Sequence, residues 1–370
     1  MKVFLSKCQD YSTANIDRAV ASILERAGGW DSILKPGARI LLKPNLLSAR
    51  KPEKGVTTHP EFLISVGRTL QAAGYDIAIG DSPGGAHKGV KRVWVNTGME
   101  YAAETLGCPL INFEASGVRR VESNGITLHI ARAIDDFDQI VSLPRLKTHS
   151  LMTYTGAVKN MFGTVVGLQK AEYHKLYPRP KDFGKMLVEL YSHVRPAFSF
   201  MDGIYGMEGD GPASGDLRPD SQIIMASDDA VAIDRVAEEF MGIDKHTWTT
   251  YLAMESGFGT GDIEIIGADL QQVKSKQPYK LPKSASFAAF APNLLVRLVG
   301  KLVWMKPALD SEKCIKCMEC KNMCPVEAIS ADKNGYPVWD YKKCVLCMCC
   351  HEICPEKAVV LKRSFLARGI

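Results

Sequence analysis

Eight cysteines near the C-terminal end of the chain are spaced as ligands of metal clusters. They form two runs of the pattern C-x2-C-x2-C-x3-C-P between residues 314 and 355. The second run repeats the first, and Lys313 with Lys343 and Ala328 with Ala358 keep the same register. The stretch is therefore an internal duplication. Its spacing is that of bacterial ferredoxins, which predicts two [4Fe-4S] clusters as cofactors.

The proline after each run decides how the cysteines are shared. Three thiolates spaced by two residues can hold three irons of one cubane, but the chain then turns away at the proline. In two-cluster ferredoxins the last cysteine of each run therefore ligates the other cluster. The first ligand set is Cys314, Cys317, Cys320 and Cys354. The second ligand set is Cys344, Cys347, Cys350 and Cys324. Cys349 adjoins Cys350 and could replace it; the repeat favours Cys350 and leaves Cys349 as a neighbouring or spare thiol.

Composition limits the location and the partners. The formal net charge is +5, but two clusters with their thiolates would contribute about −4. The small positive charge that remains gives no support to a nucleic-acid partner. Structural zinc favours two separated ligand pairs and disulfide frameworks suit short secreted chains, so neither explains the cysteines as well. Because the clusters need reduced thiols and little oxygen, we expect a cytoplasmic protein of an anaerobic or facultative organism. No signal peptide or transmembrane helix is indicated.

A second group of reactive side chains lies in the middle of the chain, just after a strand predicted at 139–143. Its members stand among glycines and are Lys147, His149, Lys159, Asn160, Lys170 and His174. Glycines let a ligand approach the backbone, and lysines bind anions or phosphates. No G-x4-G-K-[ST] sequence is present, so this is not a P-loop. We predict Lys147, Lys159, His149 and His174 as catalytic groups, and Asn160 and Lys170 as binding groups.

Two earlier strand ends carry polar residues that would face the same pocket. Lys43 and Asn45 follow a strand predicted at 39–43, and Asp81 follows one at 76–80. Ligands of parallel sheets bind beyond the carboxyl ends of the strands, so we add Lys43, Asn45 and Asp81 to the predicted binding residues. Each segment by itself is more simply explained as a turn or a helix cap; it is their combination that favours a site.

The elements that would position these groups alternate between strand and helix. Further strands are predicted at 3–7, 109–113, 197–201 and 222–226, with a hairpin over 118–130. Helices are predicted near 14–27, 60–73 and 90–106, within 188–194, and from a cap at Asp228 and Asp229 to about 241. Residues 202–212 are expected to form a glycine-rich loop whose Asp202, Glu208 and Asp210 bind a cation, balance the lysines or stay solvated. The pattern predicts an α/β fold with a mainly parallel sheet covered by helices, followed by a small α+β ferredoxin-like domain.

Composition divides the chain into three predicted parts. An α/β domain covers 1–271, a linker with a docking helix covers 272–309, and the two-cluster ferredoxin domain covers 310–370. Residues 294–304 are apolar except for Arg297 and Lys301, which share one helical face. Such a helix could lie on a membrane surface or a partner, but docking of one domain on the other is favoured because a bare apolar face would be a large exposed patch.

The stretch from 147 to 163, with its K-x-H and G-A-x-K-N-x-F-G patterns, resembles the domain-of-unknown-function 362 family. Matches at 43–45, 58–60 and 80–84, and at 202–204 with 208–209, extend the resemblance to residues 1 to about 270. Members of that family often carry a C-terminal ferredoxin-like domain. The resemblance implies an iron–sulfur protein with a pocket around Lys147, His149, Lys159 and Asn160, and it names no substrate.

Three functions compete on this sequence. The first is an electron-transfer protein that relays low-potential electrons through its clusters to or from an anionic substrate or cofactor bound in the α/β domain; whether it is an enzyme of the ferredoxin-type oxidoreductases is left open. The second is a non-enzymatic electron carrier or cluster-delivery partner whose α/β domain recognises a redox partner protein. The third, the least favoured, is a further metal site formed by His149, His174 and the acidic loop. A G-x-G-x2-G dinucleotide motif after an early strand is missing.

Overall fold

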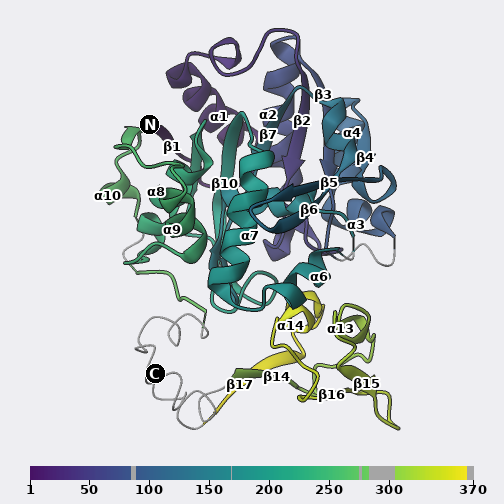
Figure 1. Ribbon diagram of the computed structural model, residues 1–370. Helices are drawn as coiled ribbons and strands as arrows, with labels where there is room; N and C mark the ends of the chain where they lie inside the picture. The colour runs from purple at the N-terminus through teal and green to yellow at the C-terminus, as the bar shows by residue number, and fades with distance from the viewer. Residues whose placement is uncertain (85–88, 168, 275–276, 283–304, 365–370) are drawn as a thin grey trace.

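The computed structural model describes residues 1–84, 89–167, 169–274, 277–282 and 305–364 (Figure 1). A large sheet of eleven strands organises the chain up to residue 267. Its main path runs in the order β13-β1-β12-β10-β7-β2-β3-β4. These strands are β1 (Lys2–Lys7), β2 (Arg39–Pro44), β3 (Asp76–Asp81), β4 (Leu110–Asn112), β7 (Gln139–Leu143), β10 (Phe198–Glu208), β12 (Ile223–Ser227) and β13 (Glu264–Gly267).

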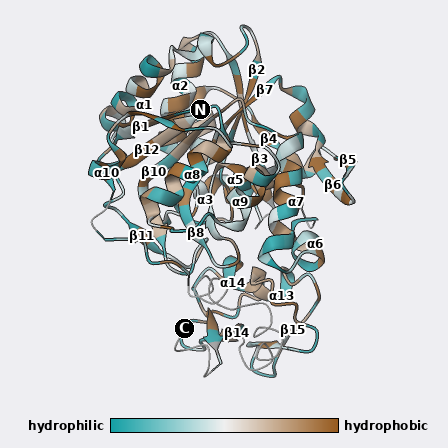
Figure 2. Cartoon of the chain, turned by 60° about the vertical axis from the view of Figure 1, so that its left-hand side comes forward, coloured by the Kyte–Doolittle hydropathy of each residue, from teal (hydrophilic) through white to brown (hydrophobic). Residues whose placement is uncertain are grey.

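Most neighbours in this sheet are parallel, as the strand–helix alternation predicts. Only β12 runs antiparallel to both of its neighbours on this path, β1 and β10. The side chains of β2 alternate between two cores: Ile40 and Leu42 pack in one apolar cluster and Leu41 in the other. The sheet therefore buries both faces, and its strands are largely hydrophobic in Figure 2. The predicted α/β class is confirmed.

Helices cover the two faces of the sheet. The cluster around Ile40 contains residues of α1 (Thr13–Ala27), α2 (Pro60–Ala72) and α4 (Met99–Leu106). The cluster around Leu41 contains residues of α5 (Ala157–Asn160), α7 (Pro180–His193), α8 (Ala230–Met241) and α9 (Trp248–Glu255). The other helices described in this part are α3 (Val90–Thr97), α6 (Gln169–Leu176) and α10 (Leu270–Val273). The layering is helix, sheet, helix.

One predicted helix and one predicted loop differ from the structure. The helix expected over 90–106 is two helices, α3 (Val90–Thr97) and α4, because Gly98 adopts a φ of 75° that ends the first. The loop expected over 202–212 is largely strand, since β10 continues to Glu208 and pairs with β11 (Asp216–Arg218). The predicted hairpin is present as β5 (Val118–Ser123) and β6 (Ile126–Ala131).

The carboxylates at the two ends of that expected loop are used in ion pairs. Asp202 is buried against Arg145 (Oδ2 to Nη1, 2.5 Å) and accepts a hydrogen bond from the hydroxyl of Tyr11 at 2.7 Å. Glu208 pairs with Arg218 at 2.8 Å. Both of these carboxylates are therefore buried and paired, rather than solvated or bound to a cation.

The C-terminal segment, residues 305–364, has small sheets of its own. Strand β14 (Met305–Leu309) pairs with β17 (Val359–Arg363), and β15 (Ile329–Ala331) pairs with β16 (Pro337–Trp339). Two short helices, α13 (Glu319–Asn322) and α14 (Cys349–Ile353), lie between the cysteines. The duplication is visible in the backbone, because the same positions of both repeats have positive φ. These positions are Lys316, Met318 and Glu327 in the first repeat and Leu346, Met348 and Lys357 in the second.

The C-terminal segment lies next to α6, beyond one end of the large sheet (Figure 1). The predicted docking helix at 294–304 lies outside the described residues. Strand β14 falls inside the stretch predicted as a linker, and the boundaries between the three predicted parts stay predictions. Across the described ranges, none of the helices has the length and apolar character needed to span a membrane.

Candidate functional site

A pocket lies beyond the carboxyl ends of β2, β3 and β7, where the C-terminal segment meets the sheet. It contains about 790 Å³ of space between protein atoms, part of it open to solvent. The predicted residues that line it are Asn45, Asp81, Lys147, His149, Lys159, Asn160, Lys170 and His174. Lys43 is not part of the lining and binds Asp81 from behind. The C-terminal segment supplies Met323, Cys349, Glu352 and Ile353.

Lys147 is fixed in the wall by neutral oxygen atoms. It stands on β8 (Arg145–His149), which pairs with β10 and with β9 (Thr153–Thr155). Its Nζ donates to the Oδ1 of Asn45 at 2.6 Å and to the carbonyl of Val56 at 2.7 Å. Burial lowers the pKa of Lys147 well below its ordinary value, and the nearby ammonium of Lys159 adds to this. An ammonium has three donors, so one N–H of Lys147 remains for a ligand.

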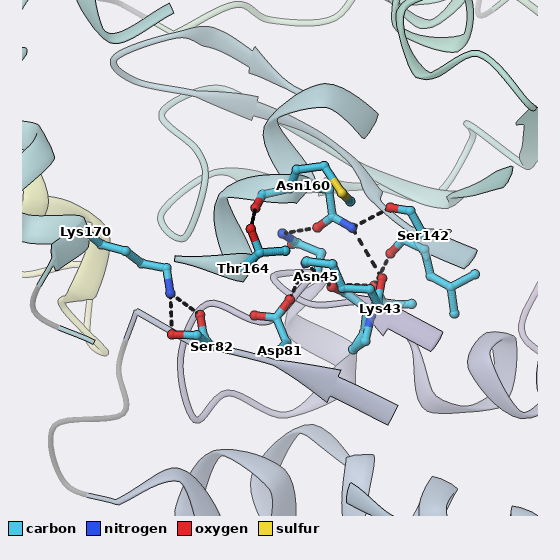
Figure 3. A network of polar contacts seen from close by, with 12 residues as sticks. Lys43, Asn45, Asp81, Ser82, Ser142, Asn160, Thr164 and Lys170 are labelled. Carbon is cyan, nitrogen blue, oxygen red and sulfur yellow. Dashed lines mark hydrogen bonds and ion pairs between the residues drawn. The ribbon is translucent and has the colours of Figure 1, made fainter. Parts of the chain in front are cut away.

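Lys43 and Asp81 form a buried ion pair at the base of the pocket (Figure 3). Burial raises the pKa of Asp81, and the ammonium of Lys43 opposes that rise. The Oδ1 of Asp81 has no hydrogen-bond partner among the described residues. Gly163 passes directly against the pair, and a Cβ there would collide with the Asp81 carboxylate and the Lys43 ammonium. The close approach explains why this position carries glycine.

Asn160 ties neighbouring strands together. Its Nδ2 donates to the Oγ of Ser142 at 2.9 Å and to the carbonyl of Lys43 at 3.4 Å, and its Oδ1 accepts from the Nδ2 of Asn45 at 3.3 Å (Figure 3). Both amide hydrogens are thus used within the protein. Asn160 lines the pocket, but its bonds orient Asn45 and the end of β2.

Lys170 and Lys159 are the two lysines supplied by helices. The Nζ of Lys170 donates to the Oγ of Ser82 at 2.6 Å and to the carbonyl of the same residue. Burial lowers the pKa of Lys170 to about 8. Lys159 lies over the ring of Phe162, 5.6 Å from its centroid, and no described carboxylate oxygen comes within 4.0 Å of its Nζ. Burial lowers its pKa as well, opposed by the charge of Glu352.

His149 is a neutral histidine with a defined tautomer. Its Nδ1 accepts hydrogen bonds from the backbone N–H groups of Leu151 (3.1 Å) and Met152 (3.3 Å). Burial lowers the pKa of His149 well below its usual range, and the charge of Lys159 contributes. A neutral ring whose Nδ1 accepts must carry its proton on Nε2. That Nε2 lies 3.6 Å from the Oε1 of Glu352.

His174 is held by aromatic rings. It stacks on Phe183 with ring centroids 4.4 Å apart and meets the edge of Phe162 at 6.0 Å. Burial lowers the pKa of His174 to about 3, so the ring is neutral at physiological pH. Its Nδ1 is buried and has no hydrogen-bond partner among the described residues.

Asp234 supports the site from behind, a role that its sequence context does not reveal. This buried residue of α8 accepts from the N–H of Ala157 (2.6 Å) and Val158 (3.0 Å), the first residues of α5, and from the hydroxyl of Tyr154 (3.0 Å). Burial raises the pKa of Asp234 to about 7. The contact fixes the short helix that carries Lys159 and Asn160.

The eight predicted cluster ligands line two separate cavities in the C-terminal segment. One, with about 340 Å³ of space, is lined by Cys314, Cys317, Cys320 and Cys354. The other, with about 290 Å³, is lined by Cys324, Cys344, Cys347 and Cys350, together with Cys349. The last cysteine of each run thus faces the cavity of the other run. All are free thiols, as a cluster requires.

Backbone geometry around the cysteines also suits cluster ligation. The N–H of Ala328 donates to the Sγ of Cys324, and that of Ala358 to the Sγ of Cys354, each at 3.2 Å. Such bonds to sulfur stabilise thiolates and tune cluster potentials. The described residues contain no group of three or more His, Cys, Asp or Glu side chains arranged around a single metal ion.

Three residues of α14 line the pocket, Cys349, Glu352 and Ile353, and none of them was predicted as a pocket residue. Cys349 lines both the lysine-rich pocket and the neighbouring cysteine cavity. Glu352 faces the pocket with an Oε1 that makes no hydrogen bond, and burial raises its pKa to about 7. Their position between ligand cysteines gave no signal of a contact with the sheet.

Three contacts from α14 and the loop after it hold the C-terminal segment over the pocket. Arg50 donates to the carbonyl of Cys354. The Nε2 of His351 lies 3.3 Å from the carbonyl of Asp210. Lys357 donates to the carbonyl of Gly215 at 2.9 Å. The pocket is therefore a joint structure of the sheet and the C-terminal segment.

Comparison with known proteins agrees with this architecture. A thylakoid-associated protein of Synechocystis is 34% identical over 255 residues, which are 68% of this chain and 78% of that protein. A pyruvate synthase subunit PorD of Pyrococcus horikoshii is 33% identical over 73 residues, 20% of this chain and 68% of the subunit. The lactate racemase apoprotein of Thermoanaerobacterium thermosaccharolyticum superposes on this chain with a TM-score of 0.42 at 12% sequence identity. The superposition covers 66% of this chain and 58% of the racemase chain, and we draw no conclusion about the fold from it.

Two family models match the chain. Residues 307–330 match the 4Fe-4S binding domain, which identifies an iron–sulfur protein with a role in electron transfer. Residues 40–239 match the domain of unknown function DUF362, and this range contains every predicted pocket residue. The protein therefore belongs to the DUF362 family and carries a 4Fe-4S binding domain at its C-terminal end.

Proposed function

We propose that the chain relays low-potential electrons, through two [4Fe-4S] clusters held by its C-terminal cysteines, to or from an anionic substrate or cofactor in the lysine-rich pocket. One observation carries this proposal: Cys349 lines both the pocket and the cavity of Cys324, Cys344, Cys347 and Cys350. A ligand in the pocket would then lie next to a cluster.

The cysteine cavities support the two ligand sets. One set is Cys314, Cys317, Cys320 and Cys354, and the other is Cys344, Cys347, Cys350 and Cys324, each lining a single cavity. When bound, each cluster supplies storage for one electron. Crossed sharing of the last cysteines would tie the two repeats together, as ligand binding by a small domain is folding free energy.

The charge of the pocket supports an anionic ligand. Lys147, Lys159 and Lys170 line it, and no described carboxylate lies within 4.0 Å of their Nζ atoms. Buried ammonium groups without a close counterion are unfavourable. An anion that binds here would form charge-assisted hydrogen bonds with them and would not have to displace a carboxylate. The roof formed by α14 reduces the access of water and strengthens these interactions.

His149 is a hydrogen-bond donor of the proposed site. Its proton is on Nε2, near Glu352, and its Nδ1 is held by two backbone N–H groups. The neutral ring can therefore donate a hydrogen bond to an oxygen atom of the ligand and stabilise negative charge that develops there. His174 also lines the pocket, and its unpartnered Nδ1 makes it the second ring able to hydrogen-bond a ligand.

Cluster number and placement can be tested on the full chain purified without oxygen. We expect about eight iron and eight sulfide per chain, and two one-electron signals by EPR. The variant Cys347→Ser should lose one signal, whereas Cys108→Ser, distant from both cysteine cavities, should keep both. About four iron per chain with an intact Cys347→Ser signal would contradict the proposed ligand sets.

A further inference from the structure

The lysines of the pocket have unused hydrogen-bond donors at separate places. Lys147 uses two of its three N–H groups on Asn45 and Val56, and Lys170 uses two on Ser82. Lys159 spends none on a described residue. A ligand thus meets one free donor beside Asn45, one beside Ser82, and three on Lys159.

These donors lie on two sides of a negative group. In Figure 3 the pair of Lys170 and Ser82 lies on one side of Asp81, away from Asn45 and Asn160. Lys147 is bonded to Asn45 and so belongs to the far side. The Oδ1 of Asp81 is buried and without a partner. An anionic group placed over Asp81 would meet this unpartnered acceptor and find no donor, whereas anionic groups on either side of Asp81 would each meet an ammonium.

The charge of the lining favours more than one negative charge on the ligand. Asp81 is neutralised by Lys43, which leaves three lysines against Glu352. Glu114 bonds to Ser82 behind the wall and offsets part of the charge of Lys170. An excess of positive charge remains even with Glu352 ionised. Apolar side chains also line the pocket, among them Leu46, Leu47 and Phe162.

We propose that the pocket takes an organic dianion with two separated carboxylate groups joined by a short carbon chain. One carboxylate would bind Lys147 and Lys159, and the other would bind Lys170 beside Ser82. The inference rests on the proposed function only in placing an anion in this pocket. It adds the class of ligand and the lysine that distinguishes it, Lys170.

The test is calorimetric titration of the anaerobic, cluster-loaded chain. The probes are straight-chain dicarboxylates of three to six carbons, the monocarboxylate of each length, and inorganic phosphate. At least one dicarboxylate should bind about tenfold or more tightly than the monocarboxylate of equal length, because it gains a second charge-assisted contact. In Lys170→Met this preference should fall to about twofold or less, because the second charge-assisted contact is lost. Lys175→Met, on the exposed side of the same helix, should keep it.

The outcomes separate this inference from the proposed function. If every dicarboxylate binds no better than its matched monocarboxylate, or if phosphate binds best, the dianion assignment is wrong even where the bound anion shifts a cluster potential. If dicarboxylates are preferred but no potential moves, the ligand class stands and the redox coupling fails. If no anion binds at all, both are wrong. If Lys170→Met does not fold, the comparison of dicarboxylates with matched monocarboxylates on the wild-type chain still tests the ligand class.

Discussion

At the scale of single residues, the pocket is lined by three lysines whose Nζ atoms have no described carboxylate within 4.0 Å. The types and the clustering of Lys147, Lys159 and Lys170 were predictable, because the sequence places them among glycines after a strand. Their bonds were not. Lys43 was expected to contact a ligand, but it neutralises Asp81 instead. The oxygen atom that each lysine binds depends on the packing of strands that are distant in the sequence. No local sequence pattern predicts that packing.

The pKa of Lys170 predicts how ligand binding depends on pH. This pKa is about 8, so the ammonium is charged below pH 8 and neutral above it. The affinity of the best dicarboxylate should therefore fall about tenfold between pH 7 and pH 9. Lys170→Arg keeps its charge over this range and should show a flatter profile. The charged groups around Lys170 are Asp81, Glu114, Lys43 and Lys159. Equal profiles for both proteins would assign the effect to another group.

Gly163 makes a second prediction at this scale. In Gly163→Ala the new methyl group would collide with the ion pair of Lys43 and Asp81. We expect a loss of about 1–3 kcal/mol of stability and a weaker affinity for anions. Gly261→Ala, where a Cβ has room, should change stability by less than about 0.5 kcal/mol. Chemical denaturation of both variants measures the difference, and an unperturbed Gly163→Ala would show that the pair can move aside.

At the scale of elements, glycines indicated a binding site in one segment but led to the prediction of a loop where the structure has the strand β10. The stretch from 202 to 211 looks like a loop because of its glycines, yet β10 runs through most of it. A Cβ at Gly203 would meet the carbonyl of Ile223, and one at Gly206 the hydroxyl of Tyr279. These glycines permit close packing within a strand rather than a turn. By contrast, β2, β3 and β7 were predictable because each is a short apolar run that ends in polar residues.

The position of helix α5 depends on the buried Asp234 of α8, which accepts the first N–H groups of that helix. Burial raises the pKa of Asp234 from 3.8 to about 7, so the folded state binds its proton more tightly than the unfolded state. The resulting stabilisation is complete below about pH 4 and is lost as the pH rises through 7, about 2 kcal/mol of it between pH 5 and pH 7.

Asp234→Asn removes this proton equilibrium. The melting temperature of the wild type relative to this variant should therefore drop by several degrees between pH 5 and pH 8. Thermal unfolding of the cluster-loaded proteins, followed by circular dichroism at matched ionic strength, provides the measurement. A difference that stays constant with pH would mean that Asp234 is ionised throughout, held by the N–H groups of Ala157 and Val158.

At the scale of the whole molecule, the site exists only where the C-terminal segment meets the carboxyl ends of the sheet strands. The sequence predicted the cysteine ligands by spacing and the pocket by composition, but nothing in it indicated that α14 covers the pocket. That contact is made by Cys349 and Glu352, which lie inside a cluster-binding run and carry no pattern of their own. Contacts between distant segments depend on complementary surfaces, which local sequence does not encode.

Arg50 links the two parts and makes the arrangement testable. Its guanidinium donates to the carbonyls of Ala213 (2.5 Å) and Cys354, so Arg50→Ala should loosen α14 over the pocket. Backbone amides of 349–354 should then exchange hydrogen about tenfold faster at unchanged iron content. Arg68→Ala, at an exposed position of α2, is the control. Unaltered exchange in Arg50→Ala would show that the other contacts hold the segment by themselves.

The central claim, that pocket and cluster are coupled, is tested most directly by an anaerobic potentiometric titration followed by EPR, with and without the best-binding dicarboxylate. An anion beside one cluster disfavours the reduction of that cluster, so its midpoint potential should fall while that of the other cluster stays unchanged. The expected fall is about 60 mV for each tenfold by which reduction weakens the binding of the dicarboxylate. Lys159→Met should reduce the shift. If the ligand binds and both midpoints stay unchanged, the pocket and the clusters act independently, and the chain is better explained as an electron carrier.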